Sequence, residues 1–356
     1  MGDGKPESQL SREVVRNRND MPPRNNSTAS ILITSYNHAS FLRACIDSAL
    51  NQSVRAEVIV VDDGSSDGSP GIIDSYGSHL VSVRTNRAGQ AGAINEGLRH
   101  ATGDLVLLLD ADDLADHFRA EQVASVFQHD SADWIRHNLA AIDEFGHVLK
   151  EHFYDFNHDL GFEIFERGRT LGITTSSLSF RRSFLDNLGP LPTYYRGYAD
   201  AYLASVACLY TRPLTIDRSL GSHRFHRAQH FSGAEALQQN RTSYHLTLNR
   251  NLAHDVQRHA ARLGRTDSLA EGRTWWQERA RFEYSKMSGR AGRGEWIGPW
   301  LSHITKTLSS ELPVRDRLLF ALRSLILGTL PKGLYSRAWW ATHYGRTTFW
   351  RSLTRR

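Results

Sequence analysis

The sequence has only two cysteines among its 356 residues, Cys45 and Cys208, and they lie far apart in apolar segments. Isolated cysteines of this kind are typical of small buried side chains in a reducing compartment, which disfavours a disulfide or a cysteine-based metal site. No apolar run reaches the roughly 18 residues of a membrane-spanning helix, and no N-terminal signal peptide is recognisable. These absences predict a cytoplasmic protein.

Acidic residues are scarce in the last third of the chain. From residue 233 to the end, 21 Lys and Arg stand against 9 Asp and Glu, and seven of the eight tryptophans lie there. Residues 1–232 have the opposite balance, with 22 basic and 29 acidic residues. The asymmetry predicts a separate surface role for the C-terminal part, on anionic lipid or nucleic acid.

Three parts follow from pattern and composition. Residues 1–29 are polar and contain Pro22-Pro23, which predicts a disordered leader. Residues 30–232 contain alternating strand-like and helix-like segments, first regular and then mixed. Residues 233–356 are basic, rich in tryptophan and mainly helical in pattern. We therefore expect one α/β domain with a helical C-terminal extension.

Strand-like runs alternate with helical spacing roughly every 25 residues between residues 30 and 113, which predicts right-handed βαβ units and a mostly parallel sheet. The expected strands are 31–35, 57–61, 80–84, 105–109 and 174–180. The expected helices are 41–50, 69–76, 89–100, 182–188 and 200–210.

Polar residues follow three of these strands, at the edge of a parallel sheet where ligands collect. The clusters are Thr34-Ser35-Tyr36-Asn37, Asp62-Asp63-Gly64 and Asp110-Ala111-Asp112. Carboxylates two residues apart on an extended turn can face one cation, and Mg²⁺ or Mn²⁺ held there would take phosphate oxygens as further ligands. A plainer alternative is an acidic turn that caps a helix starting near Leu114.

Two further segments carry small or acidic residues. The Asp62-Asp63-Gly64 loop can bind ribose hydroxyls or a base N–H, or it can simply cap the next helix. Residues 86–97 open a helix with Gly89, Gly92 and Gly97, and these glycines allow close approach to a ligand or serve packing alone.

Together these segments resemble glycosyltransferase family 2, which has the Rossmann-like GT-A fold. The matching pieces are Thr34 to Asn37, Val60 to Ser69, Gly89 to Gly97 and Leu109 to Asp113. The resemblance covers residues 30–232, with a nucleotide-binding half at 30–113 and an acceptor half at 114–232. It implies an inverting transferase of the bacterial cell-surface polysaccharide type that uses a nucleotide sugar, most commonly a UDP-sugar, and Mn²⁺ or Mg²⁺.

The resemblance also implies roles for particular residues. Donor contacts fall to Thr34, Ser35, Tyr36, Asn37, Asp62, Asp63, Gly89, Asn95, Asp110 and Ala111. Asp112 is the expected metal ligand. His226, from a segment similar to the family's Tyr-Arg-x-His, is the expected metal or phosphate contact. The acceptor side is represented by Thr175, Ser176 and Arg181.

Asp200 is the catalytic base that the resemblance implies, and it would take the proton of the acceptor hydroxyl. The family usually has a Glu-Asp pair there, and Ala199 replaces the Glu. An alternative role for Asp200 is the N-cap of the following helix.

The C-terminal part contains the apolar segment 318–327, which is flanked by basic residues and followed by Trp339, Trp340 and Trp350. Interfacial helices carry such residues, which predicts peripheral binding to the anionic inner face of the plasma membrane, where a glycan or lipid-linked acceptor would lie. The alternative is a helical cap on the catalytic domain. No nucleic-acid motif is present, so no nucleic-acid partner is expected. The Gln-x-x-Arg-Trp motif of processive relatives is missing, which favours addition of one or a few sugars.

Two other functions stay open. A non-catalytic nucleotide-sugar-binding module is compatible with Ala199. A nucleotidyltransferase also pairs an α/β sheet with acidic metal ligands, but it would have a basic, glycine-rich loop after the first strand, where this chain has Ser35-Tyr36-Asn37-His38.

Overall fold

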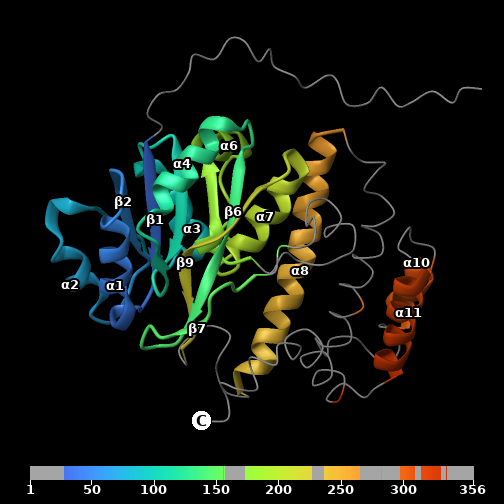
Figure 1. Cartoon of the computed structure of the whole chain (residues 1–356). Helices are drawn as coiled ribbons and strands as arrows, with labels where there is room; N and C mark the ends of the chain where they lie inside the picture. The colour runs from blue at the N-terminus through green and yellow to red at the C-terminus, as the bar shows by residue number, and fades with distance from the viewer. Residues whose placement is uncertain are drawn as a thin grey trace, which may run out of the picture.

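The computed structural model describes residues 28–154, 156, 173–226, 236–264, 282, 297–308, 314–329 and 334. These residues form a twisted sheet with helices on both faces, and further helices on one side of it (Figure 1). The leader predicted for residues 1–29 lies outside the described residues, apart from its last two positions. Trp339, Trp340 and Trp350 also lie outside them.

The first half of the domain contains the predicted βαβ units, with boundaries within about two residues of those expected. Its elements are β1 (Ala29–Ser35), α1 (Ala39–Leu50), β2 (Ala56–Asp62), α2 (Ser69–Asp74), a 3₁₀ turn (Gly77–His79), β3 (Val81–Arg84), α3 (Gly89–His100) and β4 (Leu105–Asp110). The uniformly apolar β4 is buried along Leu105 to Leu109 because helices cover both faces of the sheet.

The second half and the C-terminal part have a less regular order of elements. They are β5 (Leu114–Ala115), α4 (Arg119–His129), β6 (Trp134–Ile142), β7 (Val148–Lys150), the 3₁₀ turn η2 (Thr175–Ser177), β8 (Leu178–Arg181), α6 (Arg182–Leu188), α7 (Ala199–Tyr210), β9 (Leu214–Arg224), α8 (Ala236–Arg262), α10 (Ile297–Leu308) and α11 (Val314–Thr329).

The nine strands of the described residues form one sheet in the order β3-β2-β1-β4-β8-β6-β9-β5, with β7 added to β6. Strands β1 to β4 are parallel, and β6 and β9 run in the same direction as they do. Only β5, β7 and β8 run the opposite way, which confirms the mostly parallel sheet. Register places Ser35 beside Asp62 and Thr34 beside Asp110, so the three predicted strand ends meet at one edge.

Each face of the sheet carries its own hydrophobic core, because alternate residues of a strand point to opposite faces. Ile31 and Ile33 pack with α1 and α4, whereas Leu32 packs with α3 and α7. Helix α3 lies close to its face: a Cβ added to Gly97 would be 2.1 Å from the Leu32 Cδ1 atom.

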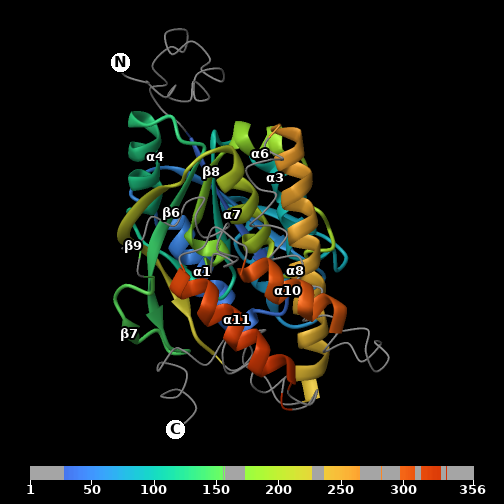
Figure 2. The same cartoon turned by 90° about the vertical axis from the view of Figure 1, so that its right-hand side faces the viewer.

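Helix α8 crosses α7, as Figures 1 and 2 show, and a buried polar network fastens it there. The Asp255 carboxylate is fully buried and accepts hydrogen bonds from the hydroxyls of Tyr194 and Tyr195. His259, one turn further along, bonds the hydroxyls of Tyr202 and Tyr210 at 3.1 and 2.8 Å. The first helix of the C-terminal part is therefore anchored to the domain.

Two expectations need correction. The strand expected at 174–180 begins only at Leu178, because residues 175–177 form a 3₁₀ turn. No helix starts near Leu114: residues 114 and 115 pair with β9 as strand β5, and α4 begins at Arg119. The acidic turn after β4 is thus not a helix cap. None of the helices in the described part of the chain combines the length and apolar character needed to cross a bilayer.

Candidate active site

The ends of β1, β2 and β4 meet the start of α3 and the end of β9 at one rim of the sheet. Asp63 ties the loops that follow β2 and β3 together there. Its carboxylate accepts hydrogen bonds from the Thr85 hydroxyl (2.6 Å) and from the amides of Ala88 (2.6 Å) and Gly89 (2.8 Å). Gly89 has φ +77°, a left-handed conformation that favours glycine. This arrangement fixes the turn before α3.

The neighbouring strand ends carry two buried oxygens that no other described group satisfies. They are the Ser35 Oγ and the Asp62 Oδ1 atoms, on residues paired directly in the β1–β2 ladder. Buried polar atoms normally have partners, so a ligand hydroxyl or an ordered water would find a site here. Beside them, Arg87 lies over the Tyr36 ring, with its guanidinium carbon 4.6 Å from the ring centre.

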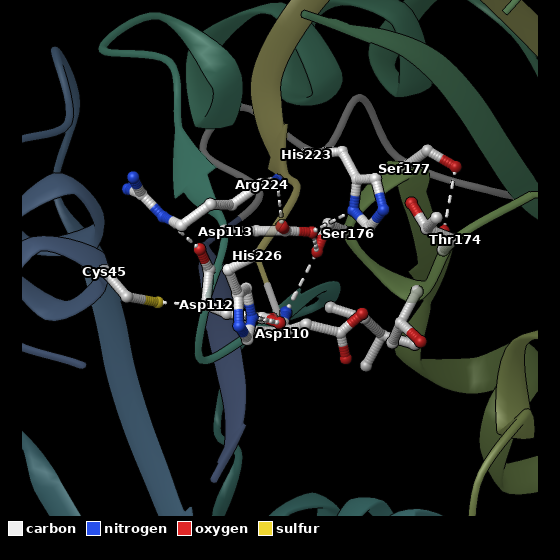
Figure 3. A network of polar contacts seen from close by, with 12 residues as sticks. Cys45, Asp110, Asp112, Asp113, Thr174, Ser176, Ser177, His223, Arg224 and His226 are labelled. Atoms are coloured by element: carbon white, nitrogen blue, oxygen red, sulfur yellow. Dashed lines mark hydrogen bonds and ion pairs between the residues drawn. The ribbon is translucent and has the colours of Figure 1, made fainter. Parts of the chain in front are cut away.

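The acidic turn after β4 is held by its third aspartate, Asp113, through the polar network in Figure 3. The Asp113 side chain is completely buried. Its carboxylate accepts hydrogen bonds from the Ser176 hydroxyl (2.6 Å) and the Arg224 amide (2.8 Å) and lies 3.2 Å from the His223 ring. The Ser176 hydroxyl also accepts a bond from the Asp110 amide (3.0 Å). Asp113 therefore joins β4, η2 and β9, and it leaves the other two aspartates for a ligand.

Asp112 meets His226 across this turn, with 2.9 Å between the carboxylate and the ring Nε2 atom. Burial opposes ionisation, but the His226 bond and the nearby His38 and His223 outweigh it and lower the pKa of Asp112 to about 2. Burial, followed by the charges of Asp113 and Asp112, raises the pKa of Asp110 well above its ordinary value. A cation bound here would relieve the repulsion between these carboxylates.

The residues at this rim fit a divalent cation that takes some of its ligands from the protein and the others from phosphate oxygens and water. Within the described part of the chain, no three His, Cys, Asp or Glu side chains converge into a ready-made cage. Mg²⁺ typically takes one or two carboxylates and completes its shell with water and substrate phosphates. The Asp112 carboxylate and the His226 imidazole provide that kind of partial donor set.

Asp200 lies on α7, across the rim from the acidic turn. Burial raises the pKa of its carboxyl to about 6, against the backbone hydrogen bond from Ala201. The charge of Asp200 contributes to the raised pKa of Asp110, so the two carboxylates are close enough to interact. The N-cap position of α7 is Tyr198, which has φ +64°, and not Asp200. A carboxyl with such a pKa suits proton transfer near neutral pH.

Sequence comparison decides the family. The family model described as Glycosyl transferase family 2 matches residues 30–189. The uncharacterised glycosyltransferase alr2836 of Nostoc sp. is 30% identical over 218 residues, which is 58% of this chain and 68% of that protein. The chain belongs to glycosyltransferase family 2.

Other relatives of this glycosyltransferase share shorter parts with it. Glycosyltransferase GlyG of Streptococcus pneumoniae is 32% identical over 120 residues, 32% of this chain and 40% of that protein. The undecaprenyl-phosphate 4-deoxy-4-formamido-L-arabinose transferase of Sodalis glossinidius is 41% identical over 92 residues, 23% of this chain and 28% of that protein. The chain spans less than half of either relative.

Solved structures show the same fold. S. aureus TarS 1–349 in complex with UDP-GlcNAc superposes with a TM-score of 0.55 at 16% identity, over 90% of this chain and 93% of that chain. Its complex with UDP gives 0.54 over the same shares. The family 2 glycosyltransferase therefore has the GT-A fold that the sequence predicts.

Most of the predicted site residues of the transferase come together at the rim. Those brought there are Thr34, Ser35, Tyr36, Asn37, Asp62, Asp63, Gly89, Asp110, Ala111, Asp112, Thr175, Ser176, Asp200 and His226. Their contacts place them together, and their roles stay predictions.

Two of the predicted residues are not brought to the rim. The Asn95 amide donates to the Leu191 carbonyl and accepts from the Leu191 amide, both at 2.8 Å, so it fastens the loop before α7. Arg181 pairs with Leu105, at the start of β4, because β8 runs antiparallel to that strand. Its guanidinium donates to the carbonyls of Phe127, Asp130 and Ala132, at the end of β4 opposite the rim.

Three residues of the site are missing from the prediction: Gln90, Asp113 and His223. Asp113 closes the acidic run and was a visible candidate, but its inward direction depends on the 3₁₀ turn at Thr175–Ser177. His223 stands where the family's motif has Tyr. Burial opposes its charge, but Asp113 outweighs that and raises the pKa of His223 to about 9. A positive charge thus faces the acidic turn.

Proposed function

We propose that this glycosyltransferase moves a sugar from a nucleotide sugar to an acceptor hydroxyl in one inverting displacement. The observation that carries the proposal is the position of Asp200, whose carboxyl has a pKa of about 6 and faces the acidic turn that ends β4. A base on one side and an acidic turn suited to a divalent cation on the other fit an attack from opposite the leaving group.

The donor side of the rim suits a nucleoside diphosphate. Strand ends with unpaired buried oxygens at Ser35 and Asp62 offer partners to ribose hydroxyls. We infer a UDP-sugar, since TarS, which shares the fold, is known with UDP and UDP-GlcNAc. Asp112 and His226 would hold Mn²⁺ or Mg²⁺, which when bound offsets the charge of the departing diphosphate. His223, with its pKa of about 9, places a further positive charge beside the turn.

On the acceptor side, Asp200 removes the proton as the acceptor oxygen attacks the anomeric carbon. A base of this type contributes about 10²–10⁴ to the rate. The replacement of the usual Glu by Ala199 leaves Asp200 as the carboxylate of that pair, and its raised pKa arises from burial.

The test is turnover by Asp200→Asn, with Asp186→Asn as the matched control. Asp186 lies on the exposed side of α6, where its described side-chain partner is Arg182. We expect Asp200→Asn to bind the donor nucleotide normally and to lose about 10²–10⁴ of transfer, and the control to keep wild-type turnover. Wild-type turnover by Asp200→Asn would exclude the assigned base. Donor binding without any turnover of the wild type would indicate a binding module, and transfer of the nucleotidyl group would indicate a nucleotidyltransferase.

Helices α10 and α11 support a further proposal, that the enzyme binds the cytoplasmic face of an anionic membrane. They lie side by side, and the Trp300 indole N–H donates to the Ser324 carbonyl at 2.8 Å (Figure 2). Apolar side chains spaced three or four residues apart on α11 are about half exposed or more. They are Val314, Leu318, Leu322, Leu325 and Ile326. This face lies within a part of the chain with excess Lys and Arg, a combination found in interfacial helices.

A membrane position suits a lipid-linked or glycan acceptor and the addition of one or a few sugars. The Sodalis relative is named for undecaprenyl phosphate, which supports a lipid-linked acceptor. Flotation with vesicles containing anionic lipid should carry the full chain upward at low salt, and Leu318→Asp with Leu322→Asp should abolish this. Equal flotation of the variant, or none of the wild type, would refute the membrane proposal and leave these helices as a cap.

A further inference from the structure

Gln90 is the second residue of α3, directly after the left-handed turn at Gly89. Three of the four hydrogen-bonding directions of its amide are used by parts of the site. The Nε2 atom donates to the Asp110 Oδ1 atom at 3.1 Å and to the Thr175 hydroxyl at 2.9 Å. The Oε1 atom accepts from the Ala199 amide at 2.9 Å. One side chain therefore contacts β4, η2 and α7.

The backbone at this position is fixed as firmly as the side chain. The Gln90 and Ala91 amides donate to the carbonyls of Arg196 and Tyr195 at 2.9 and 3.1 Å. A Cβ added to Gly89 would lie 2.6 Å from the Arg196 Cα atom, so the turn and the segment before α7 are in close contact. The start of α3 is thus joined to the chain that leads into Asp200, and the side chain has little freedom to leave its three partners.

The glutamine amide satisfies all three partners at once. The site needs donors toward Asp110 and Thr175 and an acceptor toward the Ala199 amide, which is otherwise an unpaired N–H in the first turn of α7. A carboxylate would meet the Ala199 amide but would oppose Asp110 by charge. An aliphatic side chain would fill the space and leave all three groups without this bond.

We propose that Gln90 is a positioning residue that sets the distance between the donor aspartate Asp110 and the base Asp200. It acts through the Ala199 amide, one residue before Asp200, and through Thr175 on the acceptor side. This inference rests on the proposed function. Loss of the amide would let the two sides of the site move relative to each other, and a displacement of about 1 Å can cost roughly 10²-fold in rate.

The expected signature is a change in what the donor sugar reacts with. Transfer requires the base, the acceptor oxygen and the anomeric carbon to be aligned, whereas a small water molecule can attack from several directions. Gln90→Leu should therefore lower kcat for transfer by about 10²-fold and slow donor hydrolysis much less. The transfer-to-hydrolysis ratio should fall at least tenfold. The affinity for UDP should fall much less than the rate of transfer, because Gln90 bonds one donor residue, Asp110, and no hydrogen bond joins it to Asp62, Asp63 or Asp112.

The experiment compares wild type, Gln90→Leu, Gln90→Glu and the control Gln128→Leu, a change on the exposed face of α4. Transfer, hydrolysis, UDP affinity and thermal midpoint are measured on the full chain. Gln90→Glu keeps the acceptor to Ala199 and serves if Gln90→Leu does not fold, and its partition should shift in the same direction. A wild-type ratio of transfer to hydrolysis in the folded variants would overturn the proposal. A loss of UDP affinity as large as the loss of transfer would also overturn it. A wild type without turnover on any nucleotide sugar would instead refute the proposed function itself.

Discussion

Replacement of Asp200 by Asn should make the protein more stable while it removes catalysis. Burial raises the pKa of this carboxyl from 3.8 to about 6, which means that the folded protein resists its ionisation. Above pH 6 the group is ionised in both states, and the difference of about two pH units corresponds to at most about 3 kcal/mol of destabilisation. Asparagine keeps the size and the acceptor for the Ala201 amide but carries no charge.

The size of the stabilisation by Asp200→Asn depends on pH in a defined way. Below about pH 4 Asp200 is protonated in both the folded and the unfolded chain and costs nothing. Between pH 4 and 6 the unfolded chain releases its proton first, so the stability of the wild type falls relative to Asp200→Asn. Above pH 6 the difference is constant and largest. Urea unfolding of both proteins at pH 4 and pH 7.5 measures it directly.

Asp186→Asn again provides the control, since an exposed carboxylate on α6 should change stability by less than about 0.5 kcal/mol at either pH. Two results would contradict the claim that ionisation of Asp200 destabilises the folded protein. One is an Asp200→Asn variant no more stable than wild type at pH 7.5, and the other is an equal gain in stability at both pH values. The same carboxylate would then lack the raised pKa on which its role as base depends.

Further changes test other parts of the site. With UDP bound, Mn²⁺ should raise the melting temperature of the wild-type protein further, and Asp112→Asn should abolish this extra rise while the metal-free variant stays folded. An unchanged effect of Mn²⁺ in a thermal-shift titration of the variant would count against the metal site. Gly89→Ala should destabilise the turn by about 1–3 kcal/mol and weaken UDP binding, because its φ is +77° and its Cβ would collide with Arg196; an unaltered urea midpoint would contradict this. Asp255→Ala should cost about 3–5 kcal/mol by leaving the buried Tyr195 hydroxyl unpaired and releasing α8; proteolysis of α8 at the wild-type rate would refute it.

The sequence predicts the first half of the domain well because local and global signals agree there. Each strand is a continuous apolar run that ends in a polar cluster, and the parallel arrangement brings these ends together without further information. Thr34, Asp62 and Asp110 could be placed at one rim from this pattern alone. The boundaries of α3 agree with the expected residues for the same reason.

Long-range pairing explains what sequence reasoning missed. Strand β9 runs from Leu214 to Arg224, and much of it is partly exposed and polar, so nothing in its composition predicts that it inserts between β6 and β5. His223, which was not expected at the site, reaches the acidic turn only because of that insertion, whereas His226 was expected there from the family resemblance. Arg181 was expected on the acceptor side, but the antiparallel direction of β8 carries it to the end of β4 opposite the rim, and local pattern cannot reveal strand direction.

The acidic rim shows how the fold accommodates three neighbouring aspartates. Asp113 is satisfied entirely by the protein, through Ser176, His223 and the Arg224 amide. Asp112 is stabilised as a carboxylate by His226, whereas Asp110 is left with a raised pKa and a single amide donor, Gln90. The three side chains therefore differ in charge, and Asp112, the one held as a carboxylate beside His226, is the one suited to a cation.

The configuration of the transferred sugar tests the central claim most directly. The full-length enzyme would be incubated with a nucleotide sugar of known α configuration, and the first product would be followed by proton NMR before the anomers equilibrate. Attack guided by Asp200 from the side opposite the diphosphate predicts a β-linked product. An α-linked product would contradict a single displacement at this rim.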